Sequence, residues 1–313
     1  MRLTFQPAAP PAPPVRSTDD TSTQHPVQPP LAGHLLHQPD TGEPRARHPL
    51  ARRPLAGGTR RAAGRAVVAL LAAVGLVTLA SGAAEAAASK GPFAGTGRLT
   101  VTSCPEPSLS YGGIPRTREY LTAMLKCLDK SWSAHFARNG LAFRKPEVRF
   151  YEAPERTVCG VPWPTDAAAF YCTNRGTLVF PLTGDWIEKR TDLYPLKVAA
   201  HEYGHHLQSL VGLRRHYESR IRADRAHQAE LGRRYELQAD CLSGVFLGGV
   251  RHSLSRTAGD WNALLEATRA SGDDADYRSH GKGANRAYWL KRGYQAVSPS
   301  ACDTWTAPRS RVA

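Results

Sequence analysis

The sequence predicts an α+β fold, mainly helical with a small β-sheet, for residues 89–313 of the 313-residue chain. Apolar residues recur every three or four positions over long stretches, which is typical of amphipathic helices. Only two short apolar runs are bounded by turn residues, as strands are. All six cysteines and all six tryptophans follow residue 100, so the material for a packed core lies in this part of the chain.

Five segments carry the helical pattern. The first is 117–138, in which the recurring apolar residues are Leu121, Met124, Leu125, Leu128, Trp132 and Phe136. The other four are 193–211, 223–247, 260–269 and 284–295. A charged stretch, 214–222, is expected to connect the second helix to the third.

Two short segments, 146–151 and 177–181, have the composition of strands. Few strands beside many helices indicate segregated elements rather than alternating βαβ units. By analogy of fold alone, we expect 177–181 to form the edge of a cleft, where an extended chain can pair with the main chain.

Residues 1–65 are predicted to form a disordered segment rich in proline and arginine. The first 54 residues hold twelve of the 24 prolines and no cysteine. Up to Arg65 there are nine arginines and four acidic residues, a net charge of +5. Such a composition cannot bury enough apolar surface to fold.

Residues 66–88 are predicted to be a signal peptide or a membrane anchor. The stretch 66–80 has no charged residue and follows Arg60, Arg61 and Arg65. Its length is below the roughly 20 residues that cross a bilayer, so a signal-peptide core fits better. Small residues at 84, 86 and 88 provide cleavage sites. In either case the arginines stay cytoplasmic and the following domain is exported, while cleavage of the leader stays open.

The net charge of +14 permits binding to nucleic acid, an anionic membrane or an acidic wall polymer. The sequence has no zinc finger, basic zipper or RNP-like motif, so we expect no nucleic-acid partner. A solvated basic surface is the plainest explanation of the charge. A wall-binding module remains an alternative function.

Six cysteines in an exported domain predict disulfide bonds. Six cysteines can be joined in fifteen complete ways, which sequence alone does not distinguish. Loop length and position favour Cys104–Cys127 and Cys159–Cys172, which leaves Cys241–Cys302. A zinc site made of cysteines is disfavoured because the chain has no C-x-x-C motif.

The sequence His201-Glu202-Tyr203-Gly204-His205 lies in an apolar predicted helix. Side chains four residues apart share one face of a helix, so His201 and His205 can bind the same ion. Glu202 adjoins the first ligand and is placed to act as a general base toward water. This is the H-E-x-x-H arrangement of zinc peptidases, in which each residue type has a mechanical role.

A catalytic zinc site needs a third protein ligand. Glu236 and Asp240 are four residues apart on the next predicted helix and therefore share a face. Glu236 is expected to bind zinc, and Asp240 to accept a hydrogen bond from the outer nitrogen of a ligand histidine. Glu230 is a competing ligand, but no acidic residue follows it four positions later.

Three motifs together resemble the family of bacterial neutral zinc metallopeptidases, which are of the gluzincin kind: HEYGHHLQ, ELQADC and SHGKGANR. The resemblance spans roughly Cys104 to Trp305. It implies a zincin-like, membrane-proximal metallopeptidase domain with one zinc ion at His201, His205 and Glu236, and with Glu202 as base. The usual leader of the family is short, unlike the long segment here.

His280, in the third motif, is the candidate second donor to the oxyanion, with Arg286 behind it. The expected function is therefore zinc-dependent hydrolysis of peptide bonds in a peptide or protein substrate outside the cytoplasm. A zinc-binding envelope protein without hydrolytic activity is the main alternative. Substrate, endo- or exopeptidase action and oligomeric state stay open.

Overall fold

The computed structural model describes residues 91–109, 112–164, 167–188, 190–273 and 279–313. The predictions for residues 1–65 and for the apolar segment 66–88 lie outside the described residues. Within the described part, no helix is both long enough and apolar enough to span a membrane.

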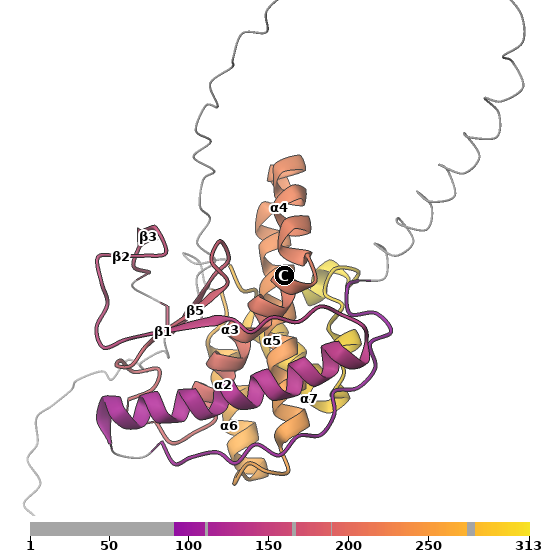
Figure 1. Cartoon of the computed structure of the whole chain (residues 1–313). Helices are drawn as coiled ribbons and strands as arrows, with labels where there is room; N and C mark the ends of the chain where they lie inside the picture. Colours follow the sequence, from indigo (N-terminus) through magenta and orange to yellow (C-terminus); the bar gives the residue numbers. More distant parts are fainter. Residues whose placement is uncertain (1–90, 110–111, 165–166, 189, 274–278) are drawn as a thin grey trace, which may run out of the picture.

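The described chain is mainly helical, as predicted. Three helices are longer than the predicted segments 117–138, 260–269 and 284–295, whereas the helix predicted at 193–211 is one residue shorter at each end and the one predicted at 223–247 begins and ends later. Figure 1 shows their arrangement, with α3 and α5 at the centre and α2 crossing beside them. The long helices are α2 Gly113–Arg138, α3 Tyr194–Leu210, α5 Gln228–Val250, α6 Ala258–Ala270 and α7 Gly283–Ala296. A short 3-10 turn, η1 Arg225–His227, lies directly before α5, and two more, η2 Pro299–Cys302 and η3 Arg309–Arg311, follow α7.

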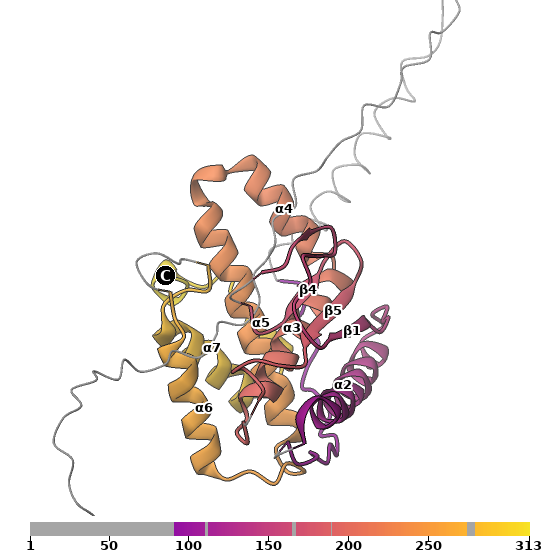
Figure 2. The same ribbon diagram turned by 90° about the vertical axis from the view of Figure 1, so that its left-hand side faces the viewer.

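The charged stretch 214–222 is helical, which corrects the predicted connection. Helix α4 spans Leu213–Ala223 and buries Leu213, Tyr217 and Ile221, spaced four residues apart. These side chains pack against Leu231 and Tyr235 at the start of α5. Figure 2 shows α4 and this part of α5 extending together beyond the rest of the described chain. The apolar spacing was visible in the sequence, but the charged residues between obscured it.

The small sheet has the strand order β1-β5-β4. Strand β5 Thr177–Pro181 pairs in parallel with β1 Glu147–Tyr151 and in antiparallel with β4 Phe170–Cys172. Strands β2 Thr157–Val158 and β3 Val161–Pro162 form a separate pair. The expectation that 177–181 forms a cleft edge is therefore wrong, because β5 has a partner on both sides. Strand β4 is the edge strand that contacts α3.

Helices α5 and α7 cross at very short distance because glycines line their contact. A Cβ atom on Gly244 would lie 2.1 Å from the carbonyl oxygen of Leu290, and one on Gly293 would lie 2.0 Å from that of Cys241. Only glycine permits such an approach between backbones. The contact brings the start of α7 beside the middle of α5, where the candidate metal ligand Glu236 lies.

Three disulfide bonds join Cys104 to Cys127, Cys159 to Cys172 and Cys241 to Cys302. They are the pairs that the sequence favoured. The third bond connects α5 to η2 near the C-terminal end of the chain. Disulfides form and persist in oxidising compartments, so this feature is typical of a protein outside the cytoplasm.

Candidate metal centre

Helices α3 and α5 carry the candidate ligands and pack closely where those residues lie. A Cβ atom on Gly204 would lie 3.2 Å from the Cα atom of Ala239, tighter than an ordinary van der Waals contact, so the two helices are close-packed at this point. His201 and His205 point from one face of α3, with their ring centroids 4.8 Å apart. Glu236 faces them from α5.

Three side chains converge on one buried point. The Nε2 atoms of His201 and His205 each lie 3.2 Å from Oε2 of Glu236. One ligand atom from each of the three residues lies within 4.8 Å of the others. Two imidazoles and one carboxylate are a ligand set of catalytic zinc sites, which leave one coordination position open.

The unsatisfied polar atoms of this group fit a bound cation. Both carboxylate oxygens of Glu202 and the Oε1 atom of Glu236 are buried, and they have no hydrogen-bond partner among the described residues. Buried polar atoms without partners are rare because each costs about 1–3 kcal/mol. A metal ion at His201, His205 and Glu236 would compensate for this cost.

The charge balance supports the same conclusion. Lys197 and Arg286 are buried cations, while Glu202, Glu236 and Asp240 are buried carboxylates. With neutral histidines and an ionised Glu202, two positive and three negative charges leave a net charge of −1. Without a metal, Glu236 overcomes the effect of burial and raises the pKa of His205 to about 9, so a positive charge is favoured at this position. Burial by itself would raise the pKa of Glu236, but His205, His280 and His201 lower it, so the carboxylate stays ionised. A divalent cation bound here would therefore have an ionised carboxylate ligand and would lie among buried side chains whose net charge is negative.

Outer contacts fix both histidine rings. Nδ1 of His201 lies 2.9 Å from Oδ1 of Asp240, and Nδ1 of His205 lies 2.9 Å from Oε1 of Gln208. Each acceptor holds the proton on Nδ1 and leaves the Nε2 lone pair directed at the metal position. The ring of Tyr235 also stacks on His205, with centroids 5.1 Å apart. The predicted contact of Asp240 with a ligand histidine is present.

Sequence analysis missed Lys197 and Gln208. Nζ of Lys197 lies 2.6 Å from Oδ1 of Asp240. The amide of Gln208 donates to the carbonyl of Tyr235 at 2.8 Å, which orients its oxygen toward His205. Lys197 lies four residues before His201 and Gln208 lies three residues after His205, so each shares a helix face with a candidate ligand. This spacing was the sequence feature from which both could have been predicted.

Glu202 is fully buried beside the ligands. Burial raises the pKa of Glu202 to about 7, and His201 and His205 oppose the shift. A carboxylate with a pKa near neutrality can both accept and release a proton at neutral pH.

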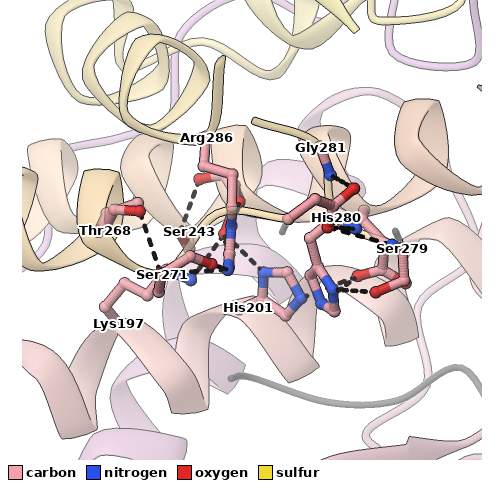
Figure 3. A network of polar contacts seen from close by, with 12 residues as sticks. Lys197, His201, Ser243, Thr268, Ser271, Ser279, His280, Gly281 and Arg286 are labelled. Atoms are coloured by element: carbon pink, nitrogen blue, oxygen red, sulfur yellow. Dashed lines mark hydrogen bonds and ion pairs between the residues drawn. The ribbon is translucent and has the colours of Figure 1, made fainter. Parts of the chain in front are cut away.

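His280 joins the group from the segment before α7. Its Nε2 atom lies 3.2 Å from Oε2 of Glu236, and its Nδ1 atom lies 2.6 Å from Oγ of Ser279. Figure 3 shows His280 beside His201, with Lys197 and Arg286 meeting on the other side of His201. Burial lowers the pKa of His280 to about 3, so its ring is neutral. A neutral ring that accepts the Ser279 hydroxyl proton at Nδ1 carries its own proton on Nε2.

His206, the histidine that follows the H-E-x-x-H motif, and the competing ligand Glu230 both have contacts away from the metal group. His206 places Nε2 at 2.6 Å from the carbonyl of Arg144 and Nδ1 at 3.2 Å from the hydroxyl of Tyr171 on β4. Glu230, the competing ligand, pairs instead with Arg234 and Arg309.

Comparison with known proteins agrees with this geometry. Residues 46–305 match the model of a family described as "Putative neutral zinc metallopeptidase". The chain belongs to this family. The family name implies zinc, and His201, His205 and Glu236 form a group that can hold it.

Curated relatives carry no assigned activity in their names. "Uncharacterized protein YpfJ" of Escherichia coli (strain K12) is 30% identical over 208 residues, which cover 60% of this chain and 71% of that protein. "Uncharacterized protein Rv2575" of Mycobacterium tuberculosis (strain ATCC 25618 / H37Rv) is 30% identical over 192 residues, covering 53% of this chain and 64% of that protein. No solved structure matches the chain.

Proposed function

We propose that the chain is a zinc-dependent peptidase that acts outside the cytoplasm, with His201, His205 and Glu236 as metal ligands. The observation that carries this proposal is the position of Glu202. Its carboxylate is buried next to the ligands, without a hydrogen-bond partner in the described part of the chain. A purely structural metal site has no use for such a carboxylate.

Glu202 acts as the general base and then as the general acid. Its pKa of about 7 lets it take a proton from the attacking water and return it to the leaving amine. Zinc, when bound, would supply Lewis-acid polarisation of the scissile carbonyl and of water. The surrounding helices exclude bulk solvent, which strengthens the electrostatic interactions of Glu202.

His280 donates a hydrogen bond to the negative charge that develops on the substrate. Its ring is neutral and carries its proton on Nε2. This Nε2 atom lies 3.2 Å from Oε2 of Glu236, so the proton is directed toward the metal group. Such a donor typically contributes about 3 kcal/mol to stabilisation of the transition state.

The substrate is a peptide or protein segment in extended form. Strand β4 is the edge strand next to α3, and its Tyr171 contacts His206 of that helix. An extended peptide can add to such an edge through main-chain hydrogen bonds. The three disulfides support a location outside the cytoplasm, and the apolar segment 66–88 would direct export as a signal peptide or an anchor.

Glu202→Gln tests the proposal directly. The variant should keep one zinc per chain and lose hydrolysis of a peptide library, because the amide cannot accept the proton. Glu236→Ala should lose zinc as well as hydrolysis. Equal cleavage by wild type and Glu202→Gln would contradict the assigned base. Zinc bound by a wild-type protein that cleaves no peptide would favour the non-hydrolytic alternative.

A further inference from the structure

Arg286 connects the part of the structure that carries His201 with the part that carries His280. The side chain is fully buried. Its Nε atom donates to Oδ2 of Asp240 at 2.9 Å, and its Nη2 atom donates at 3.3 Å to Oδ1, the oxygen that also accepts from His201. Its opposite nitrogen donates to the carbonyl oxygen of Ser271 at 2.7 Å and to the Ser271 hydroxyl at 3.2 Å. The rigid guanidinium fork thus bridges α5 and the end of α6, as Figure 3 shows.

Asp273 lies two residues after Ser271 and holds the backbone around His280. Its Oδ1 atom accepts the N–H groups of Ser279 at 3.1 Å and of His280 at 2.8 Å. Its Oδ2 atom accepts the N–H group of Gly281 at 2.8 Å. The N–H group of Asp273 in turn donates to the carbonyl of Gly281 at 2.9 Å. Three donors on one carboxylate make strong, charge-assisted contacts.

The ends of α6 and α7 meet without room for a side chain. A Cβ atom on Gly272 would lie 2.0 Å from the backbone nitrogen of Gly283, and one on Gly283 would lie 1.7 Å from the carbonyl oxygen of Arg269. This backbone contact fixes the segment that contains Ser271 and Asp273. The backbone of His280 is therefore held in place by contacts that do not involve the His280 ring.

We propose that Arg286 and Asp273 are positioning residues that set the place of His280 relative to the metal ligands. The contacts run from His201 through Asp240 to Arg286, then through Ser271 and Asp273 to His280. The catalytic meaning of this arrangement rests on the proposed function, whereas the physical connection does not.

A simpler role for Arg286 would be to neutralise Asp240. Lys197 allows these two roles to be distinguished. Its Nζ atom lies 2.6 Å from Oδ1 of Asp240, but it makes no hydrogen bond to Ser271 among the described contacts. If both residues only neutralised the charge of Asp240, substitution of Lys197 and substitution of Arg286 would have the same effect. Positioning requires that only Arg286 affect the segment 279–281.

Hydrogen–deuterium exchange of the full chain tests the proposal in Arg286→Lys, Asp273→Asn and the control Lys197→Met. Arg286→Lys keeps the positive charge but cannot bond Asp240 and Ser271 at once. We expect the amides of residues 279–281 to exchange about tenfold faster or more in the first two variants, because charge-assisted contacts that protect them weaken. The control should leave these amides as in wild type, and residues 236–240 should keep their protection in Arg286→Lys.

Wild-type exchange at residues 279–281 in Arg286→Lys would overturn the proposal, as would an equal effect of Lys197→Met. A uniform loss of protection over α5 and α7 would also overturn it. Kinetics add a second readout on any peptide that the wild type cleaves. Arg286→Lys should lower kcat with little change in KM, and should change kcat by no more than about twofold in a His280→Ala background, because coupled residues are not additive. If the wild type hydrolyses no peptide, the proposed function is contradicted. The exchange experiment then still decides whether Arg286 and Asp273 position the segment that contains His280.

Discussion

Asp240 accepts a hydrogen bond from Nδ1 of His201 across 2.9 Å, and neither side chain is exposed to solvent. The same carboxylate forms ion pairs with both Lys197 and Arg286. Burial would raise the pKa of Asp240, but Arg286, Lys197 and His201 hold it well below its usual range. One side chain therefore orients a candidate metal ligand and pairs with two buried cations.

Asp240→Asn should affect both functions of this carboxylate. The amide leaves Lys197 and Arg286 without an anionic partner, which costs about 3–5 kcal/mol of unfolding free energy. Loss of the contact with His201 should weaken zinc binding by about 10–100-fold. Urea unfolding without metal measures the first effect, and competition with a chromophoric chelator measures the second.

Glu230→Gln is the matched control on the same helix. Glu230 pairs with Arg234 and Arg309, but its side chain is 19% exposed and solvent screens the interaction. The variant should lose no more than about 1 kcal/mol of stability and keep its zinc affinity. If Asp240→Asn binds zinc as tightly as this control does, the outer contact of His201 has no role in metal binding.

Gly244→Ala should destabilise the fold by forcing α5 and α7 apart. The new Cβ atom would meet backbone atoms, the Leu290 carbonyl oxygen at 2.1 Å and the Tyr294 nitrogen at 2.9 Å, which cannot rotate away. Overpacking of this kind costs about 1–3 kcal/mol or more. The urea midpoint of the variant should fall.

Gly232→Ala makes the same chemical change elsewhere in α5. Its nearest neighbour would be the Tyr217 hydroxyl at 3.6 Å, an ordinary contact. Alanine has the better helix propensity by about 1 kcal/mol, so this variant should be as stable as wild type or more stable. Equal losses at both positions would show that the close crossing of α5 and α7 is not what stabilises this region.

Removal of the Cys241–Cys302 bond should cost more stability than removal of Cys159–Cys172. The two bonds close separations of 61 and 13 residues, which correspond to about 4 and about 3 kcal/mol of loop-closure entropy. Paired cysteine-to-alanine variants, compared by urea unfolding, measure the difference.

The same disulfide should also affect metal binding. Gln238 donates to the carbonyl of Cys302 at 2.9 Å and accepts from Gln208, the partner of His205. We therefore expect the variant that lacks Cys241 and Cys302 to bind zinc more weakly, while the one that lacks Cys159 and Cys172 keeps its affinity. The reverse order in the chelator assay would contradict this connection.

The metal group was predictable because helical spacing encodes which side chains share a face. His201 and His205 are four residues apart, as are Glu236 and Asp240. Two such pairs on two different helices need only one packing contact between those helices to converge. That contact occurs at Gly204 and Ala239, which the sequence could not pair in advance.

The parts that were missed depend on contacts between distant segments. The role of β5 was predicted wrongly because its flanking partners β1 and β4 are set by tertiary pairing. Helix α4 was missed, and 214–222 was predicted as a connection, because the apolar face of α4 is completed by residues at the start of α5. Lys197 is charged and fully buried, and only the structure shows that Asp240 compensates for it.

His135 on α2 should make the fold sensitive to acid. The residue is buried on α2, and burial together with Arg138 lowers its pKa from 6.5 to about 4. Above pH 6.5 neither the folded nor the unfolded chain protonates this ring. Between pH 6.5 and 4 only the unfolded chain binds the proton, so the unfolding free energy should fall by up to about 1.4 kcal/mol per pH unit.

His135→Gln isolates this contribution because glutamine does not titrate and can still accept from Arg138. Other groups titrate in the same range, so the quantity to follow is the difference in unfolding free energy between wild type and variant. As pH falls from 6.5 to 4 that difference should shift against the wild type, and below pH 4 it should become constant because both states are protonated. Parallel stability curves across this range would mean that His135 keeps an ordinary pKa in the folded chain, and that its burial is relieved by water or by movement of Arg138.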